Sequence, residues 1–170
     1  MAEKKVSDTF FSLLECDLAG LGATAALARA LAERARPGDV YGLRGELGVG
    51  KTTLARFFVG ALAGPETEVP SPTFTLVQTY ESPAGTIWHF DLYRLESPED
   101  AYELGIEDAF ADGISLIEWP DRLGPLLPAD TLDLWLRHGA SAGARRVRLA
   151  GGGEWPERLQ DGLGGLGAGR

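Results

Sequence analysis

Apolar residues recur along the chain with two spacings, one typical of helices and one typical of strands. Residues 24–36 carry leucines and alanines on one face ahead of Pro37-Gly38, which predicts an amphipathic helix with Thr24 as its N-cap. Residues 53–63 repeat this pattern and stop at Gly64-Pro65, so a second helix is expected there. Short apolar runs predict strands at 9–16, 39–43, 114–117, 131–136 and 145–150.

A turn signal at residues 82–85 separates two further candidate strands, 74–80 and 86–90. The pair predicts an antiparallel hairpin. Ser97-Pro98 followed by Glu99-Asp100 predicts another helix start, because proline suits the first helical position and acids suit the first turn. Strands that alternate with helices indicate an α/β layer fold with a largely parallel central sheet, to which the hairpin adds antiparallel edge strands. Ligands of such sheets bind at the carboxyl ends of the strands.

The chain length sets the domain organisation. The chain has 170 residues, which suits one domain with a sizeable core, and we assign residues 1–150 to it. Residues 151–170 are rich in glycine, so a mobile C-terminal tail is expected, with one short helical piece near residues 155–159.

Composition narrows the possible settings and partners. No apolar run approaches the ~20 residues of a membrane span, and no secretory signal is visible. A single cysteine, Cys16, excludes an internal disulfide and fits the cytoplasm, while one cysteine and two histidines make a zinc site an unfavoured interpretation. The formal net charge of −9 argues against gripping nucleic acid directly, so a role in nucleic-acid chemistry is expected to run through a protein partner. A local basic patch can bind nucleic acid even when the net charge is negative. Arg145, Arg146 and Arg148 form the one such cluster in the sequence.

The most specific motif is the run Gly45-Glu46-Leu47-Gly48-Val49-Gly50-Lys51-Thr52, which fits the phosphate-binding pattern G-x-x-x-x-G-K-[ST] at every fixed position. Glycines let the backbone curl so that successive N–H groups point at phosphate oxygens. The lysine supplies a point charge for the β- and γ-phosphates, and the threonine hydroxyl can ligate Mg²⁺. A chance glycine-rich turn is the alternative, but the predicted strand before the run and the predicted helix after it are the context that the motif requires.

Two acids stand where the rest of such a site is expected. Asp91 follows the apolar run 87–90, and Glu118 follows the run 114–117. One could hold Mg²⁺ and the other could orient the attacking water, and the residues alone do not divide these roles. The alternatives are a turn residue or an Arg94 ion pair for Asp91, and a plain surface acid for Glu118.

Several other residues have two readings. Ser71 and Thr73 lie in the extended segment after the second helix, where nucleotide switches sense the γ-phosphate, although rigid-loop hydroxyls are an equal alternative. Trp119 could cover the pocket or pack in the core. His89 is expected in the core or donating to a neighbour. Packing roles are expected for Tyr41 and Trp135.

The motifs together carry a family resemblance. The segments GELGVGKTT, SPTFTLV, HFDLYRL, ELGIED and IEWPDRL, in this order between Thr24 and Leu149, resemble the TsaE (YjeE) family of bacterial ATPases. Glu46 stands where aspartate is common in that family. The resemblance implies a three-layer P-loop NTPase fold and ATP hydrolysis in support of N6-threonylcarbamoyladenosine formation at position 37 of ANN-decoding tRNAs. It also implies the TsaB and TsaD proteins as partners, with tRNA engaged only through the complex.

The resemblance also implies roles for individual residues. Thr52 and Glu118 are expected to hold Mg²⁺, and Lys51, Asp91 and Glu118 form the expected catalytic set. A late arginine, Arg145 or Arg146, is expected to approach the nucleotide, ATP or ADP. The full expected nucleotide-binding set is Thr24, Glu46, Leu47, Gly48, Val49, Gly50, Lys51, Thr52, Thr53 and Arg145.

Two other functions compete with an ATPase subunit. A small-molecule kinase is one, but such enzymes usually close an arginine-bearing lid over the phosphate, and none is evident in the sequence. A non-catalytic nucleotide switch is the other. Guanine specificity is disfavoured because the Asn-Lys-x-Asp base reader needs an asparagine, which this chain lacks.

Overall fold

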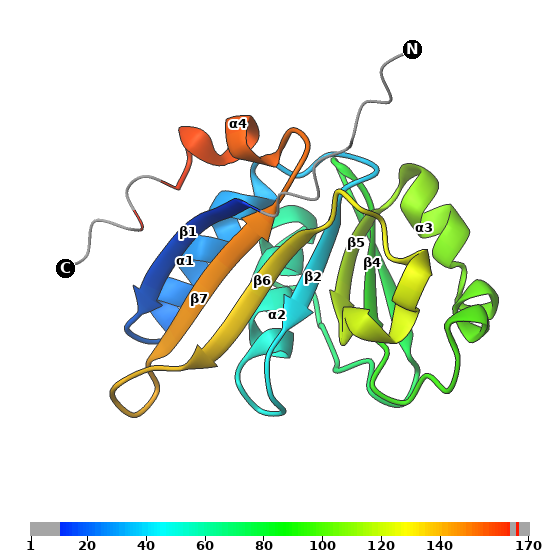
Figure 1. Cartoon of the computed structure of the whole chain (residues 1–170), viewed down its shortest axis with the longest axis horizontal. Helices are drawn as coiled ribbons and strands as arrows, with labels where there is room; N and C mark the ends of the chain where they lie inside the picture. The colour runs from blue at the N-terminus through cyan, green and yellow to red at the C-terminus, as the bar shows by residue number, and fades with distance from the viewer. Residues whose placement is uncertain (1–10, 164–165, 167–170) are drawn as a thin grey trace, which may run out of the picture.

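The computed structural model describes residues 11–163 and residue 166, with side chains placed from Leu14 onward. Its central feature is a sheet of seven strands in the order β1-β7-β6-β2-β5-β4-β3 (Figure 1). The strands are β1 (Phe11–Leu18), β2 (Val40–Arg44), β3 (Val77–Ser82), β4 (Gly85–Asp91), β5 (Ile114–Glu118), β6 (Leu132–His138) and β7 (Arg145–Gly151). The helices are α1 (Leu21–Ala32), α2 (Lys51–Ala63), α3 (Ile106–Asp112) and α4 (Trp155–Gln160), with 3₁₀ segments η1 (Pro98–Leu104) and η2 (Pro120–Leu126).

The middle of the sheet is parallel and its two margins are antiparallel. β6, β2, β5 and β4 pair in parallel, whereas β1 with β7, β7 with β6 and β3 with β4 pair antiparallel. The expected α/β class, the parallel centre and the antiparallel hairpin at residues 77–91 are therefore confirmed. The parallel register aligns Asp91 with Glu118 and Glu118 with Leu43, so three strand ends meet at one edge of the sheet.

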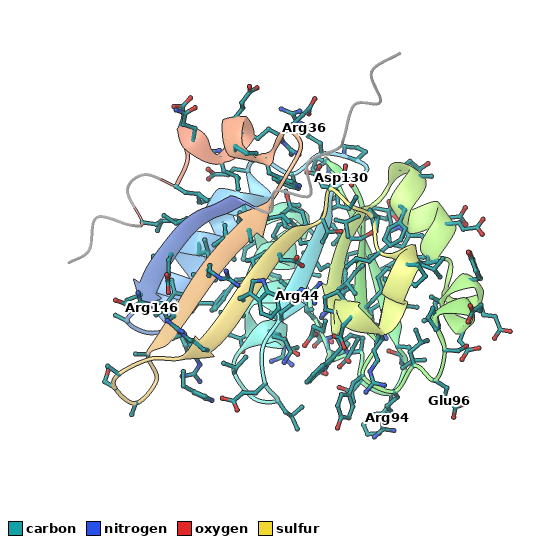
Figure 2. All side chains as sticks on the ribbon, viewed as in Figure 1. Arg36, Arg44, Arg94, Glu96, Asp130 and Arg146 are labelled. Carbon is teal, nitrogen blue, oxygen red and sulfur yellow. The ribbon has the colours of Figure 1, made fainter. Side chains whose placement is uncertain are left out.

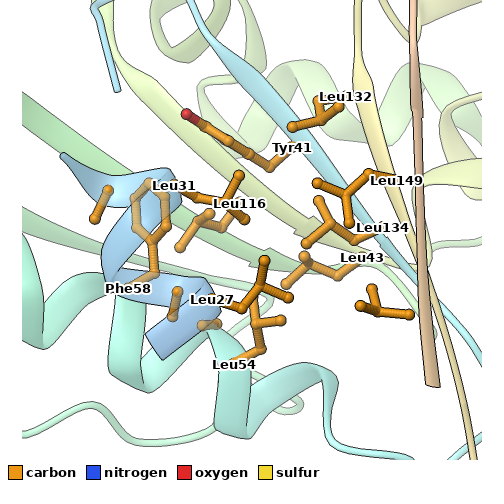
Figure 3. Packing of buried hydrophobic residues seen from close by; sticks show 14 of the residues in the cluster. Leu27, Leu31, Tyr41, Leu43, Leu54, Phe58, Leu116, Leu132, Leu134 and Leu149 are labelled. Atoms are coloured by element: carbon orange, nitrogen blue, oxygen red, sulfur yellow. The ribbon is translucent and has the colours of Figure 1, made fainter. Parts of the chain in front are cut away.

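A large core lies between the sheet and helices α1 and α2. Leucines of α1, Leu54 and Phe58 of α2, and inward residues of the strands interlock there (Figure 3). Tyr41 is buried in it and meets Phe58 edge to face, with ring centroids 5.0 Å apart, so its expected packing role is confirmed. Burial of such side chains stabilises the fold by roughly 1.5–3 kcal/mol each.

The opposite sheet face is covered only in part. A second core lies between β4, β5 and β2 and the segments η1, α3 and η2, and includes Phe90, Ile106 and Ile117. In Figure 1 this cover lies over β5 and β4, while β1, β7 and β6 face the viewer with no helix in front of them. The fold is therefore three-layered over one half of the sheet, and for the described residues it is two-layered over the other.

Several predicted boundaries are corrected by the structure. Helix α1 starts at Leu21 with Gly20 as its N-cap, so the assignment of Thr24 as N-cap is wrong: Thr24 lies in the first turn, and its hydroxyl donates to the Gly20 carbonyl (3.4 Å). The helix ends at Ala32 rather than at residue 36. Strand β3 begins at Val77 rather than residue 74, because a turn closes first between the Leu76 N–H and the Pro72 carbonyl (2.7 Å).

The C-terminal segment differs from expectation as well. The predicted helical piece is α4, and Trp155, Leu159 and Leu163 are buried in the large core. The Trp155 indole donates to the Asp130 carbonyl (2.6 Å), and Arg158 makes a bidentate pair with Asp39 (2.8 and 2.6 Å). The expectation of a mobile tail is therefore wrong for residues 151–163. The predicted tail residues 164–165 and 167–170, and positions 9–10 of the first predicted strand, lie outside the described residues.

Within the part of the chain that the structure describes, none of the helices has the length and apolar character needed to cross a membrane.

Candidate nucleotide-binding site

The loop between β2 and α2 has a backbone path that glycine makes possible. Gly45, Gly48 and Gly50 have φ values of 138°, 79° and 115°, in the region that L side chains rarely adopt. A Cβ at Gly45 would also collide with the Leu136 carbonyl of the neighbouring strand β6. The loop therefore curls tightly against the sheet and delivers Lys51 to the first turn of α2. Its amide groups and the positive end of the helix dipole together favour an anion.

Lys51 is buried under this loop. Its side-chain ammonium donates to the carbonyls of Gly45 (2.5 Å) and Glu46 (2.8 Å) and lies 4.4 Å from the centroid of the Trp119 ring. Burial lowers the pKa of the Lys51 ammonium, and the nearby charges of Glu118, Asp91 and Glu46 counter that effect. The ammonium is thus held beneath the loop by two backbone carbonyls.

Thr52, Glu118 and His89 form a chain of side chains across three elements. The Thr52 hydroxyl donates to Glu118 Oε1 (2.7 Å), and His89 Nε2 lies 2.7 Å from Glu118 Oε2. Glu118 and His89 are both buried. Glu118 as a plain surface acid is therefore excluded, and the structure brings it to the predicted Mg²⁺-binding threonine. His89 is fully buried, as the core alternative expected, and it also lies within hydrogen-bond distance of a neighbour, the Glu118 carboxylate.

Asp91 takes a different set of partners. Its Oδ2 accepts from the Thr73 hydroxyl (3.1 Å), which is itself 2.8 Å from the Ser71 hydroxyl. Its Oδ1 accepts from the Tyr93 N–H (3.1 Å), so the turn role considered from sequence is real. Arg94 stacks over the Phe74 ring at 4.6 Å, and no Asp91–Arg94 ion pair is present among the described residues. The carboxylate therefore ties the 70–76 segment to the end of β4.

These groups surround one cavity of about 270 Å³. It is smaller than a cavity of about 570 Å³ between α1 and α2, so chemistry rather than size singles it out. Trp119 lines it with a left-handed backbone (φ 59°, ψ 52°), which places the ring beside Lys51, and its side chain also packs against the second core, so both alternatives for Trp119 are observed in part. The lining is Leu47, Gly48, Gly50, Lys51, Thr52, Thr53, Ser71, Thr73, Asp91, Glu118 and Trp119.

The remaining predicted residues are placed differently. Glu46 is exposed and its carboxylate lies 3.3 Å from His138 Nε2, while Val49 is buried beneath the loop. Arg145 Nε donates to the Val49 carbonyl (2.6 Å), whereas Arg146 projects from the other sheet face and pairs with Glu15 and Asp17. Of the two late arginines, Arg145 is the one at the loop. Thr24 is absent from the cavity lining, so its approach to the nucleotide stays a prediction.

The donor set fits Mg²⁺. Cis ligands in an octahedral shell with bonds near 2.1 Å lie about 3 Å apart, and the Thr52 and Glu118 oxygens are 2.7 Å apart. Both are hard oxygen ligands, which this ion prefers, and phosphate and water supply the other positions in P-loop sites. Among the described residues, no group of three or more His, Cys, Asp or Glu side chains could hold a metal by itself.

An α/β sheet with a parallel centre, whose β2–α2 loop curls around a buried lysine, defines a P-loop NTPase-like fold. Comparison with known proteins gives the family. Residues 18–147 match the model of the family described as "Threonylcarbamoyl adenosine biosynthesis protein TsaE". The chain therefore belongs to the TsaE family.

Individual relatives agree with this assignment. The chain is 44% identical to the Rickettsia bellii "tRNA threonylcarbamoyladenosine biosynthesis protein TsaE" over 110 residues, 65% of this chain and 76% of the relative. It is 36% identical to the Bacillus subtilis protein of that name over 115 residues, 67% and 71% of the two chains. In the Rickettsia felis relative the match spans 65% of that protein. The crystal structure of Bacillus subtilis YdiB superposes with a TM-score of 0.74 at 28% identity, covering 91% of this chain and 95% of that one.

Proposed function

We propose that this protein is a Mg²⁺-dependent ATPase that binds ATP and ADP through residues 45–53 and acts in the cytoplasm. The observation that carries the proposal is the arrangement around Lys51: a buried ammonium held on two loop carbonyls, with the Thr52–Glu118 pair beside it. The ammonium can pass from those carbonyls to phosphate oxygens with little movement of the helix that bears it. Uncompensated charge is costly to bury, so a buried lysine that serves only packing is an unfavoured explanation.

The different contacts of Asp91 and Glu118 support a proposed division of roles between them. Thr52 and Glu118 would hold Mg²⁺, which would supply positive charge to offset that of the phosphates. Asp91 does not contact Thr52; it faces the cavity together with Thr73, and we assign it to accepting a proton from, and orienting, the attacking water. Thr73 links this carboxylate to the 70–76 segment, which is a suitable position for sensing the γ-phosphate.

We further propose that ATP hydrolysis supports formation of N6-threonylcarbamoyladenosine at position 37 of ANN-decoding tRNAs, together with TsaB and TsaD. Family membership and the names of the relatives support the pathway. The acidic chain, with a net charge of −9, supports contact with tRNA through the complex rather than alone.

Phosphate release from MgATP, measured with and without TsaB and TsaD, tests the proposal. We expect slow turnover by the protein alone, a change of rate when the partners are added, and loss of turnover in Lys51→Ala. Calorimetry with ATP and ADP in the presence of Mg²⁺ measures binding separately. Turnover that persists in Lys51→Ala, or the absence of any nucleotide affinity, would overturn the assignment.

A further inference from the structure

The sheet face of β1, β7 and β6, over which no helix of the described residues lies, carries an ordered row of side chains. Strand register aligns Arg44 with Trp135, Trp135 with Arg148, and Arg148 with Glu15, so the four lie side by side across four strands. All four point away from the large core, because alternate residues of these strands, such as Leu134 and Val147, point into it. Figure 2 labels Arg44 and Arg146 on this face.

Trp135 stands at the middle of the row with 42% of its surface exposed, so its expected packing role is wrong. The Arg44 guanidinium lies 5.0 Å from the centroid of its ring and the Arg148 guanidinium 5.6 Å. Such cation–π contacts stabilise exposed pairs by about 0.5–1 kcal/mol each. Together they hold a large exposed ring and two guanidinium groups in a fixed arrangement, which lowers the entropy cost of binding a partner.

The arginines of this face differ in how far they are neutralised. Arg44 pairs with Asp133 (2.8 Å), and Arg146 and Arg137 both pair with Glu15 (2.8 and 3.0 Å). Arg148 has no hydrogen-bond or ion-pair partner among the described residues. It lines a hollow of about 410 Å³ with Glu15, Trp135, Leu136, Arg137 and Arg146, where three guanidinium groups face one carboxylate.

The charges of the whole face favour a protein over RNA as the occupant. Four arginines (44, 137, 146 and 148) stand among three acids (Glu15, Asp17 and Asp133), which is too balanced a set to hold a polyanion against a net charge of −9. Two guanidinium groups already lie over the Trp135 ring, which leaves less of the ring for a base to stack on. Tryptophan and arginine are instead the residues enriched at the energetic centres of protein interfaces.

We infer that this face, centred on Trp135 and Arg148, is a docking surface for a partner protein. The partner presents a carboxylate to the Arg148 guanidinium in the hollow and an apolar side chain to the exposed edge of Trp135. This inference rests on the proposed function in one respect: the partner tested first is the TsaB–TsaD pair.

Binding of the full chain to the purified TsaB–TsaD pair of the same organism, measured by calorimetry or interferometry, tests the inference. We expect Trp135→Ala and Arg148→Glu each to weaken binding at least about 10-fold, with Trp135→Phe retaining most of it. Arg29→Glu on α1 is the matched control, because it makes the same charge change at an exposed arginine of the other sheet face and should bind as wild type. MgATP affinity and thermal melts of each variant verify that fold and nucleotide site are intact.

The other outcomes separate the two proposals. If the wild type binds and both Trp135→Ala and Arg148→Glu bind equally well, the docking surface is overturned, but the proposed function is unaffected. No binding by wild type removes TsaB–TsaD as partners and overturns the docking inference with them. If the chain binds tRNA alone and Arg148→Glu abolishes that binding, the occupant is RNA and the inference is overturned. If the chain forms a dimer in sedimentation and Arg148→Glu dissociates it, the occupant is a second copy of this chain, and the inference is again overturned.

Discussion

The His89 imidazole and the Glu118 carboxylate meet with Nε2 and Oε2 2.7 Å apart, and both side chains are buried. Because an ionised carboxylate only accepts hydrogen bonds, we assign a proton to Nε2 of the ring. The other oxygen of Glu118 is then fixed toward Thr52, where the metal is proposed to bind. His89 is thus a positioning residue that acts through Glu118, much as outer-shell groups orient metal ligands elsewhere.

Replacing His89 should impair the use of Mg²⁺ without removing the nucleotide. We expect His89→Ala to reduce turnover or Mg²⁺ affinity about 10–100-fold, as the loss of outer-shell partners does in metal sites. His89→Gln keeps a donor and should recover part of the loss. Turnover measured against Mg²⁺ concentration checks this, alongside ADP affinity without metal. If His89→Ala and His89→Gln lower the melting temperature equally and leave the Mg²⁺ dependence of turnover normal, the His89–Glu118 pair serves only the fold.

Asp91→Asn should slow ATP turnover while nucleotide affinity stays close to that of wild type. The amide oxygen can still accept from the Tyr93 N–H, and the amide nitrogen can donate to the Thr73 hydroxyl oxygen, so the local fold is kept while the base is lost. General base catalysis typically contributes about 10²–10⁴-fold, which sets the expected loss in kcat. Single-turnover hydrolysis and calorimetry separate the two quantities. A variant that no longer binds ATP would instead place Asp91 in a structural role.

Adjacent arginines on β7 should behave differently. Arg145→Ala removes the bond to the Val49 carbonyl inside the phosphate loop, and we expect about a 10-fold weaker affinity for ATP, equivalent to about 1.4 kcal/mol. Arg146→Ala makes the same chemical change on the opposite sheet face and serves as the control, with ATP affinity unchanged. Calorimetry on the two variants decides between these expectations. Matching losses would mean that total charge, rather than contact with the loop, sets affinity.

The Arg44–Asp133 pair should make stability depend on pH. Burial raises the pKa of the Asp133 carboxyl above its ordinary value of 3.8, and Arg44 counters this only in part. The folded state therefore binds the Asp133 proton more tightly than the unfolded state does. The stability that this proton contributes is present below pH 3.8 and is lost as pH rises through the raised pKa. Arg44→Ala leaves the carboxylate unpaired and should cost about 3 kcal/mol at pH 7. The cost should shrink toward pH 4, as the carboxyl takes up a proton.

Urea unfolding of wild type, Arg44→Ala and Asp133→Asn between pH 4 and pH 7 measures this dependence. Asp133→Asn removes the titrating group and should flatten the difference between the two pH values. A cost of Arg44→Ala that is constant across this range would mean that the arginine stabilises through packing on Trp135 instead.

Trp155→Ala should destabilise the protein by about 3–5 kcal/mol, the usual cost of deleting a buried tryptophan. Its ring meets Tyr41 edge to face at 5.3 Å, and its indole N–H is satisfied by the Asp130 carbonyl. The exposed neighbour Glu157→Ala on the same helix is the control and should change stability by less than about 0.5 kcal/mol. Thermal or urea unfolding checks both, and a cost below 1 kcal/mol would restore the view of this segment as a dispensable tail.

The sequence was informative wherever a local pattern decides the structure. Gly45, Gly50 and Lys51 are found where the loop motif predicted them, because the motif encodes the backbone path itself. Asp91 and Glu118 converge because parallel strands end at one edge of a sheet. The choice between Arg145 and Arg146 could also have been made from sequence. Val147 and Leu149 point into the core, and alternation then puts Arg145 on their side.

Features that depend on long-range packing could not be predicted in this way. Whether Trp135 is exposed or buried depends on which half of the sheet the segments η1, α3 and η2 cover. No local sequence pattern predicts that choice. Trp155 and Leu159 lie in a glycine-rich stretch whose composition indicates mobility, while their burial depends on a gap beside Tyr41 that only the assembled core creates. The His89–Glu118 pair joins residues 29 positions apart and needs the β4–β5 register to be known.

Strand β7 carries residues of both the proposed nucleotide site and the proposed docking surface. Arg145 holds the phosphate loop on one side of the sheet, and its neighbours Arg146 and Arg148 belong to the open face on the other. Because one rigid strand bears all three, a slide of β7 along its own axis displaces the loop anchor and the outer guanidinium groups together. The proposed nucleotide site and the proposed docking surface would then be coupled through neighbouring residues of one strand, with no hinge between them.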